Sequence, residues 1–289
     1  MKISEKDLTK LSTIRVKSHA KYFCEPENID DIKKAIDFSD RHNLQIEILG
    51  NGSNILFSKE IYKQKLFLKL TGEFSFFEEK NGFIEIGAAY SLKLAGKKMI
   101  KLGLEDYVFF NLIPACIGGA ITQNAGTGSD GEIKDVCMSV KLFDVLNNKV
   151  IELSNKNCLF GYRDSIMKKE RGRFIILSGK FNSKNKVPNI KNLITICKDR
   201  MQEKVNREPL GYSFGSTFVN NKLPAWECVK RVKNKLSNTK GAFYSEKHNN
   251  WIINNENAKG EDIVSLIKNT QKIVKEELGF DLINEVRIV

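Results

Sequence analysis

The sequence predicts an α+β protein in three parts. A short β-α-β-like pattern comes first, a strand-rich stretch follows, and the last part combines short strands with a long amphipathic helix. This order of elements is typical of α+β folds, in which strands and helices occupy separate regions of the chain. The 289 residues are enough for two or three compact units of ordinary size.

The first part contains a helix expected at residues 26–42. Isoleucines recur on one face at helical spacing, and Pro26 suits the first turn. A strand is expected at residues 45–49, and extended chain resumes at residues 55–57. This part is therefore small and β-α-β-like.

The middle part consists mostly of stretches that alternate or run apolar, as strands do. We expect strands at residues 66–70, 83–88, 140–145, 149–153 and 174–181. A helix is expected at residues 92–102, with Ser91 as its N-cap and Gly103 at its end. Asn147-Asn148 is a plausible turn between two of the strands.

The last part follows a helix expected at residues 190–205. Pro209, Gly211 and Gly215 interrupt regular structure after that helix. We expect a short helix at residues 225–232, a strand at 251–254, a long helix at 261–278 and extended chain at 283–289. The long helix is expected to bury Ile263, Leu266, Ile267, Ile273 and Val274 on one face.

The chain is basic, with a formal net charge of +12 at pH 7. This charge fits nucleic-acid binding, attraction of a polyanionic small molecule, or a lysine-rich composition with no specific partner. The lysines are spread along the whole chain, which favours the last of these. No stretch approaches the about 20 apolar residues of a membrane helix. The charged N-terminus resembles no secretory signal, so we expect a cytoplasmic protein without a membrane partner.

The cysteines and histidines give little support to a metal site. None of the six cysteines forms a CxxC pair, and the three histidines are scattered. We therefore expect reduced, mostly buried thiols and no metal.

The loop Gly50-Asn51-Gly52-Ser53-Asn54 follows the expected strand of the first part. Backbone amides without bulky side chains can approach a phosphate closely, and Ser and Asn add donors. The loop lacks the third glycine of a dinucleotide-binding fingerprint and the Gly-Lys-Ser/Thr of a Walker A loop. By itself it fits a plain tight turn as well as a phosphate loop.

A second glycine-rich segment lies at residues 111–132, which carry few helix or strand signals. Gly118-Gly119 lies in an apolar surround, and an Asn-Ala-Gly follows at residues 124–126. Bare backbone amides among apolar residues suit a diphosphate and the polar edge of a flat ring. The alternative is a buried β-corner with glycines for close packing. An irregular stretch of this length inside a domain is usually functional.

A series of segments in this chain resembles the UDP-N-acetylenolpyruvoylglucosamine reductase family. They are residues 49–56, 113–114, 118–120, 124–126, 131–133, 160–165, 215–220, 245–248, 252–254 and 285–286. Each is weak alone, but their occurrence in the family's order over about residues 12–289 is specific. The length resembles the shorter subtype, which lacks an insertion in the C-terminal domain.

The resemblance implies a vanillyl-alcohol-oxidase/PCMH-type FAD-binding fold of two subdomains plus a C-terminal α+β substrate domain. Applied to this chain, it predicts FAD-binding subdomain 1 at residues 1–65, FAD-binding subdomain 2 at residues 66–200 and the substrate-binding domain at residues 201–289. It also implies NADPH as co-substrate and reduction of a UDP-sugar enolpyruvyl ether in peptidoglycan precursor synthesis. The expected partners are these small molecules, and the expected state is a monomer.

The matching segments supply the expected FAD-binding residues. They are Gly50, Asn51, Gly52, Ser53, Asn54, Ile113, Pro114, Gly118, Gly119, Ala120, Asn124, Ala125 and Gly126.

Three further residues match the family's catalytic positions. Ser216 matches the proton donor, while Arg163 and Glu285 match residues that engage the enolpyruvyl carboxylate and stabilise the intermediate. Tyr162 and Asn220 match substrate contacts. Without the resemblance, Ser216 would be interpreted as a turn serine, and Arg163 and Glu285 as solvated surface charges.

The chain departs from the family pattern at several positions. Lys17-Ser18 stands where the family usually has Gly-Gly, and Val219 stands where it has a basic residue. Glu208 replaces a usual glutamine. These changes keep open two alternatives, a paralogue that reduces a related enolpyruvyl sugar for a surface glycan and a non-catalytic FAD-binding module.

Overall fold

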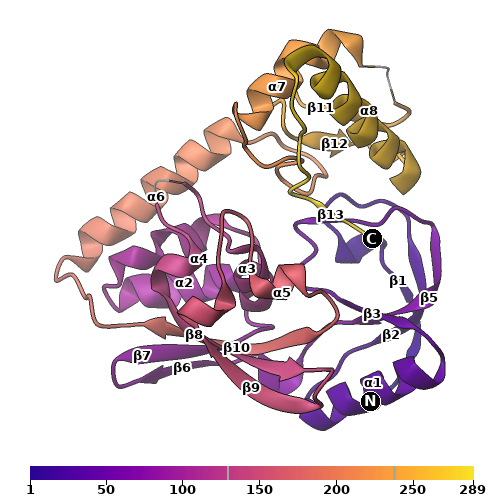
Figure 1. Cartoon of the computed structure of the whole chain (residues 1–289). Helices are drawn as coiled ribbons and strands as arrows, with labels where there is room; N and C mark the ends of the chain where they lie inside the picture. The colour runs from indigo at the N-terminus through magenta and orange to yellow at the C-terminus, as the bar shows by residue number, and fades with distance from the viewer. Residues whose placement is uncertain (129, 237–238) are drawn as a thin grey trace. The chain divides into compact units, whose positions relative to one another are not determined.

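The computed structural model describes residues 1–128, 130–236 and 239–289. The described chain divides into two compact units, each assembled from separate stretches of sequence (Figure 1). Unit 1 contains residues 1–4, 22–51 and 64–204, and unit 2 contains residues 5–21, 52–63 and 205–289.

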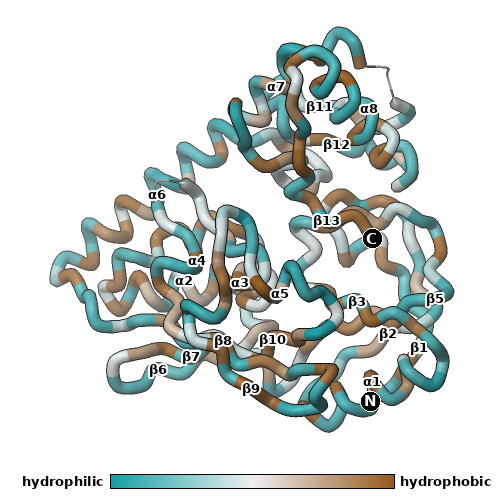
Figure 2. The backbone as a smooth tube through the Cα atoms, viewed as in Figure 1, coloured by the Kyte–Doolittle hydropathy of each residue, from teal (hydrophilic) through white to brown (hydrophobic). Residues whose placement is uncertain are grey.

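Unit 1 is built on an antiparallel five-stranded sheet in the order β6-β7-β10-β8-β9. These strands are β6 (Phe77–Lys80), β7 (Phe83–Gly87), β8 (Cys137–Asp144), β9 (Lys149–Ser154) and β10 (Phe174–Asn182). The central strand β10 buries six of its nine residues, and Figure 2 shows hydrophobic stretches along it. Consecutive residues of a strand point to opposite faces of the sheet, so this run of buried residues means that both faces of β10 are covered.

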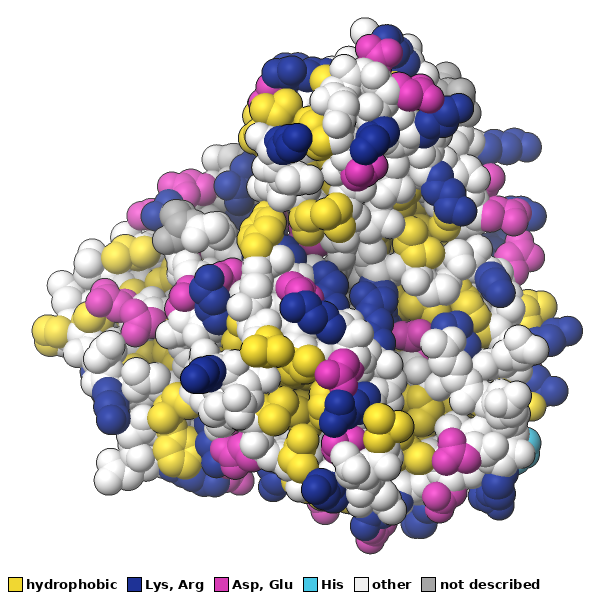
Figure 3. Space-filling view, in the orientation of Figure 1, with side chains coloured by type: hydrophobic (Ala, Val, Ile, Leu, Met, Phe, Trp, Pro, Cys, Tyr) yellow, Lys and Arg dark blue, Asp and Glu magenta, His cyan; other side chains and the backbone are white. Residues whose placement is uncertain are grey.

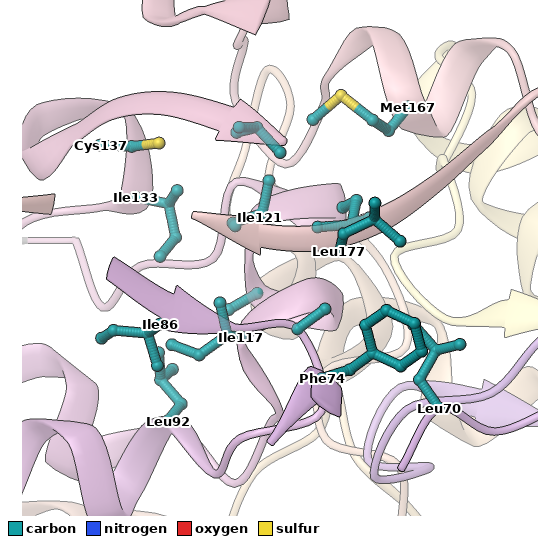
Figure 4. Packing of buried hydrophobic residues seen from close by; sticks show 14 of the residues in the cluster. Leu70, Phe74, Ile86, Leu92, Ile117, Ile121, Ile133, Cys137, Met167 and Leu177 are labelled. Atoms are coloured by element: carbon teal, nitrogen blue, oxygen red, sulfur yellow. The ribbon is translucent and has the colours of Figure 1, made fainter. Parts of the chain in front are cut away.

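The helices of unit 1 complete its core. They are α1 (Ile29–Arg41), α2 (Leu92–Lys101), α3 (Ile117–Gln123), α4 (Ile133–Val136), α5 (Ile166–Lys169) and most of α6 (Ile190–Arg207). Figure 4 shows Ile117 of α3 packed near Ile86 of β7 and Leu92 of α2. All three side chains are fully buried. A 3₁₀ helix, Glu105–Leu112, leads from α2 to this core.

Unit 2 packs α7 (Ala225–Val232) and α8 (Gly260–Leu278) around a second apolar cluster. It contains two small sheets. The antiparallel pair is β11 (Ala242–Tyr244) with β12 (Ile252–Asn254). The parallel pair is β4 (Ile55–Leu56) with β13 (Arg287–Ile288), which joins stretches more than two hundred residues apart in sequence.

A further sheet has the order β1-β2-β5-β3. Its strands are β1 (Ser4–Asp7), β2 (His19–Cys24), β3 (Gln45–Ile48) and β5 (Ile61–Leu68). The chain passes from one unit to the other within β1, β2 and β5. Within unit 1, β3 pairs with β5 in parallel.

Most elements expected from the sequence are present, with shifted ends. The helix expected from residue 26 begins at Ile29 instead, because Asn28 is the N-cap and its side chain accepts a hydrogen bond from the Asp31 amide. Ser91 caps α2 as predicted. The prediction of an irregular segment at residues 111–132 was wrong in part, since α3 lies inside it. The strands β1, β2, β6 and β11 carried no signal that we recognised.

The six cysteines are free, and all but Cys197 are buried, as expected. No helix of the described chain is long and apolar enough to cross a membrane. Lys and Arg side chains are scattered over the face drawn in Figure 3, interspersed with Asp and Glu. The division into two FAD-binding subdomains and a substrate domain stays a prediction.

Candidate active site

The two predicted cofactor loops meet inside unit 1. A Cβ at Gly50 would lie 2.7 Å from the Cys116 Sγ, so any larger residue there would force the Cys116 side chain to move. The Asn51 side-chain amide donates to the Pro114 carbonyl over 3.4 Å. Residues about sixty positions apart in sequence are therefore held side by side.

The rest of the first loop belongs to unit 2. Gly52 has φ +70°, and a Cβ there would lie 1.9 Å from the Leu11 carbonyl oxygen. The Gly52 carbonyl accepts hydrogen bonds from the backbone amide and the hydroxyl of Thr13. Ser53 is half-buried, and Asn54 donates from its side chain to the Glu285 carbonyl over 3.2 Å. Contacts within the protein therefore explain Gly52 and Asn54 whether or not the loop binds a ligand.

The second loop contains the start of α3. The amides of Ile117 and Gly118 donate to the carbonyls of Tyr90 and Ala88, at 3.0 and 2.8 Å. A Cβ at Gly118 would lie 3.2 Å from Ala88, so close packing explains this glycine. Gly119 is exposed, and a Cβ there would meet only the Cys116 Sγ at an ordinary 3.6 Å. Packing within the protein therefore does not require glycine at position 119.

The other predicted residues of this loop flank α3. Ile113 and Pro114 precede it with Ile113 half-buried and Pro114 exposed, and Ala120 is buried within it. Ala125 and Gly126 follow its end, and Gly126 pairs with Glu132 in an isolated antiparallel bridge.

Asn124 fixes the end of α3. It is fully buried and left-handed, with φ 43°, a conformation that Asn tolerates better than most residues. Its side-chain amide donates to the Gly161 carbonyl over 2.7 Å, and its oxygen accepts from the Lys134 amide over 2.9 Å. Asn124 thereby joins the second loop to the segment that contains Tyr162 and Arg163.

Arg163 lies beside the second loop in unit 1. Its Nη2 donates to the Gly126 carbonyl over 2.6 Å, and its guanidinium carbon lies 5.1 Å from the centre of the Tyr162 ring. The residue has φ 54°, which costs a non-glycine residue about 1 kcal/mol or more. Lys168 donates to its carbonyl and Ser165 donates to the Thr122 carbonyl, so the turn is held from several sides.

Ser216 and Glu285 meet in unit 2 through the backbone of Thr217. The Thr217 carbonyl accepts from the Glu285 amide over 2.8 Å and from the Val286 amide over 3.3 Å. Ser216 forms an antiparallel bridge with Trp251. The predicted proton donor and the predicted acid therefore lie on segments that are directly hydrogen-bonded to each other.

Two buried side-chain atoms in these segments have no hydrogen-bond partner among the described residues. They are the Gln123 Nε2, in the second loop, and the Thr217 Oγ1, next to Ser216. An unpaired buried polar group is costly, and an unplaced ligand or water is a common explanation. Neither Gln123 nor Thr217 was predicted as a site residue from the sequence. Whether a buried polar atom has a hydrogen-bond partner depends on the neighbours that the fold places around it.

Asn220 has a structural contact of its own. Its side-chain oxygen accepts from the Ala225 amide over 2.9 Å, at the start of α7. The side chain is otherwise exposed. Its predicted role as a substrate contact stays a prediction, as do those of the other site residues.

His248 lies in the turn that precedes Trp251. Burial lowers its pKa below the ordinary value, and the positive charge of Arg207 adds to this effect, while Glu208 opposes it. The Nδ1 faces the Asn250 amide at 3.3 Å, so this nitrogen carries the lone pair. Both observations favour a neutral imidazole. Among the described residues, no group of His, Cys, Asp and Glu side chains could hold a metal ion.

Two family models match this chain. The model described as "FAD binding domain" matches residues 20–154. The model described as "UDP-N-acetylenolpyruvoylglucosamine reductase, C-terminal domain" matches residues 206–289. The first range contains both predicted cofactor loops, and the second contains Ser216 and Glu285.

Relatives that align over nearly the whole chain carry the name of the same enzyme. A UDP-N-acetylenolpyruvoylglucosamine reductase of Caldanaerobacter subterraneus subsp. tengcongensis is 33% identical over 270 residues, covering 91% of this chain and 85% of the relative. One of Prochlorococcus marinus is 29% identical over 285 residues, covering 98% and 95%. The crystal structure of UDP-N-acetylenolpyruvylglucosamine reductase (MurB) from Thermus caldophilus has the same fold, with a TM-score of 0.81 over 100% of this chain and 99% of that one, at 24% identity.

Proposed function

The chain belongs to the UDP-N-acetylenolpyruvoylglucosamine reductase family, and we propose that it reduces the enolpyruvyl ether of UDP-N-acetylglucosamine enolpyruvate to UDP-N-acetylmuramate. This reaction is a step of peptidoglycan precursor synthesis. The observation that carries the proposal is the joining of Ser216 and Glu285 through the Thr217 carbonyl, within the segment that matches the family's C-terminal domain.

The residues of unit 1 fit FAD. Gly119 is an exposed residue near the start of α3 in the glycine-rich loop, and Gly50 and Asn51 lie against the same loop. The Gln123 Nε2 is buried and lacks a partner among the described residues, so a polar group of a bound cofactor would satisfy it. We assign FAD binding to the residues of the two predicted loops that lie in unit 1, with Gln123 added, and the roles of Gly52, Ser53 and Asn54 stay predictions.

FAD, when bound, supplies the hydride for one carbon of the enol ether, with NADPH as its source. The protein must supply a proton to the neighbouring carbon. We assign this role to the Ser216 hydroxyl. A hydroxyl is a weak acid, but a carbanion next to a carboxylate is a strong base, so a partly buried hydroxyl can donate to it.

Arg163 is suited to the enolpyruvyl carboxylate. Its planar guanidinium can form two parallel hydrogen bonds to a carboxylate, and its fixed charge stabilises negative charge that develops there. The contacts to Gly126, Tyr162 and Lys168 hold the turn in place before substrate binds. Tyr162 is more than half exposed, which leaves its ring available to a substrate.

Glu285 is the third proposed catalytic residue. Its backbone is fixed by the Thr217 carbonyl and by the Asn54 side chain. We propose that Glu285 stabilises the intermediate and that it is protonated or paired with a cation when the substrate carboxylate is present, since two bare carboxylates repel each other.

The replacement of a basic residue by Val219 supports a second candidate. Val219 lies three residues after Ser216 in the same matching segment, and its amide donates to the Ile283 carbonyl. A paralogue that reduces a related enolpyruvyl sugar for a surface glycan would need a different charge pattern at this position. The two candidates differ only in the sugar substrate.

We also propose that the enzyme works as a cytoplasmic monomer and binds neither nucleic acid nor membrane. The scattered lysines support this proposal, because a nucleic-acid site requires basic residues gathered on one face. Sedimentation of the pure protein tests the monomeric state, and a duplex-binding assay at low salt tests the absence of nucleic-acid binding.

The test of the main proposal is a two-step reaction under anaerobic conditions. NADPH should bleach the yellow protein, and the UDP-enolpyruvyl sugar should then restore the colour. Restored colour with only a different enolpyruvyl sugar would favour the paralogue. A protein that takes up no FAD would contradict the proposal altogether.

A further inference from the structure

Asn250 is a buried polar residue at the back of the Ser216 segment. Its side chain is only 4% exposed, and it makes two hydrogen bonds to one residue. Its oxygen accepts from the Phe218 amide over 3.0 Å, and its amide donates to the Phe218 carbonyl over 2.8 Å. Its own backbone carbonyl accepts from the Thr217 amide over 2.8 Å. Asn250 therefore holds the two residues that follow Ser216.

The local chain path explains why a side chain takes this role. Ser216 pairs with Trp251 as neighbouring strands do, but the chain reverses just before Trp251, where the Trp251 amide donates to the His248 carbonyl. The backbone therefore cannot continue the pairing as far as Phe218. A primary amide carries the donor and the acceptor of a peptide group, so the Asn250 side chain satisfies Phe218 as a strand neighbour would.

The held segment also carries the Glu285 contact. The Thr217 carbonyl accepts from the Glu285 amide, and Phe218 forms a bridge with Asn284. A shift of the Thr217–Phe218 backbone would therefore displace both Ser216 and the segment of Glu285. Misplacement of a reacting group by about 1 Å can slow an enzyme about 100-fold.

We propose that Asn250 is a positioning residue that sets the Ser216 hydroxyl for proton donation. The inference rests on the proposed function of Ser216, and it extends that function to a residue outside the predicted catalytic set. Asn250 touches neither cofactor nor substrate in this role. It acts through the Thr217 and Phe218 peptide groups.

The first test replaces Asn250 by alanine and measures the two half-reactions separately. Asn250→Ala should leave reduction of the flavin by NADPH within about twofold of the unchanged protein. Return of the colour on adding the UDP-enolpyruvyl sugar should slow about 10- to 100-fold. The effect should fall on kcat rather than on the KM for the sugar, since the substrate contacts are elsewhere.

Asn250→Asp adds a pH readout that a general loss of stability would not produce. A protonated aspartate has one acceptor and one donor and can replace both bonds to Phe218, whereas the ionised form cannot donate to the Phe218 carbonyl. The rate of colour return, relative to the unchanged protein at each pH, should be closest to normal at low pH and fall as pH rises. Asn250→Ala should show no such recovery.

Asn254 provides a matched control in the same unit. It is 2% exposed, and its side chain makes three hydrogen bonds, to Ile14, Glu256 and Ala258, none of which involves the Ser216 segment. Asn254→Ala should lower stability by a similar amount but leave the colour return of the folded protein within about threefold of normal.

Each outcome of these measurements supports or contradicts the positioning role of Asn250. If the unchanged protein never recolours, the proposed function fails, and the inference fails with it. If it recolours and Asn250→Ala recolours at the same rate, only the positioning role is wrong. Equal losses in Asn254→Ala and Asn250→Ala would also overturn it. If Asn250→Ala does not fold, the pH dependence of Asn250→Asp decides, and its absence contradicts the proposal.

Discussion

The predicted site residues of unit 1 and those of unit 2 are held in place by different means. In unit 1, the cofactor loop and the Arg163 turn are joined by side chains that bond to backbone carbonyls, chiefly Asn124 to Gly161 and Arg163 to Gly126. In unit 2, Ser216 and Glu285 are joined by backbone hydrogen bonds at Thr217, and the side chains of Asn250 and Asn54 support their segments.

The difference has a consequence for mutation. A site joined by side chains is disrupted when one of those residues changes, whereas a backbone ladder persists when a side chain on it is removed. We therefore expect loss of the Ser216 side chain to slow the chemistry without a loss of stability, and loss of a joining side chain in unit 1 to lower both together.

The largest expected effect is that of Ser216→Ala. Loss of a general acid slows a reaction about 10²- to 10⁴-fold, while the Thr217 ladder stays intact. Stopped-flow absorbance should show normal bleaching by NADPH and almost no colour return with the sugar. A variant that recolours normally would mean that another group donates the proton.

Asn124→Ala should show the opposite behaviour in unit 1. It leaves the Gly161 carbonyl and the Lys134 amide without their partner and places alanine in a left-handed conformation. We expect the free energy of unfolding to fall by about 2–4 kcal/mol and FAD to bind more weakly. Urea unfolding with and without FAD measures both changes. Loss of FAD affinity at unchanged stability would contradict the expected link between stability and cofactor binding in unit 1.

Arg163→Lys should have an intermediate effect. Lysine keeps the charge but not the planar fork, so kcat/KM for the sugar should fall about 10- to 100-fold. The contact with the Gly126 carbonyl also weakens, so we expect a measurable loss of stability as well. Steady-state kinetics measure the fall in kcat/KM, and thermal unfolding measures the loss of stability. A purely kinetic change would show that this contact contributes nothing to the fold.

The smallest effect concerns pH. Because the pKa of His248 is lowered in the folded protein, the folded state binds fewer protons there than the unfolded state. This contribution to stability is present above the ordinary histidine pKa of about 6.5 and is lost as pH falls below it toward the folded value. His248→Gln should flatten the pH dependence of unfolding below about pH 6.5. An unchanged slope would assign that dependence to other groups.

Much of the fold was predictable because its signals are local. Ser91 caps α2 through its own side chain, and the apolar positions of α8 follow its helical repeat. The strands β1 and β2 were missed because their residues carry little alternation. The helix α3 was missed because its glycines disfavour a helix locally, while burial of Ile117 and Ile121 stabilises it.

The residues of the site that lie in short motifs were predictable, whereas those defined by distant contacts were not. The glycine loops and the three catalytic candidates could be named because they match short motifs in a fixed order. The role of Asn250 depends on a hydrogen-bond partner, Phe218, that is distant in sequence. The roles of Thr217 and Gln123 depend on buried side-chain atoms that have no hydrogen-bond partner among the described residues. No pattern in a single sequence reports such contacts.

The pairing of β4 with β13 also bears on how the chain is made. A ribosome releases the Ile55–Leu56 strand long before residues 287–289, which supply its partner and the Val289 carbonyl that accepts from Ser58 and Tyr62. Unit 2 therefore cannot close until residues 287–289 have been synthesised, and the early apolar strand at Ile55–Leu56 must wait for them. Contacts of this sequence separation fold slowly and expose aggregation-prone chain. We expect newly made protein to depend on chaperones more than its size alone would suggest.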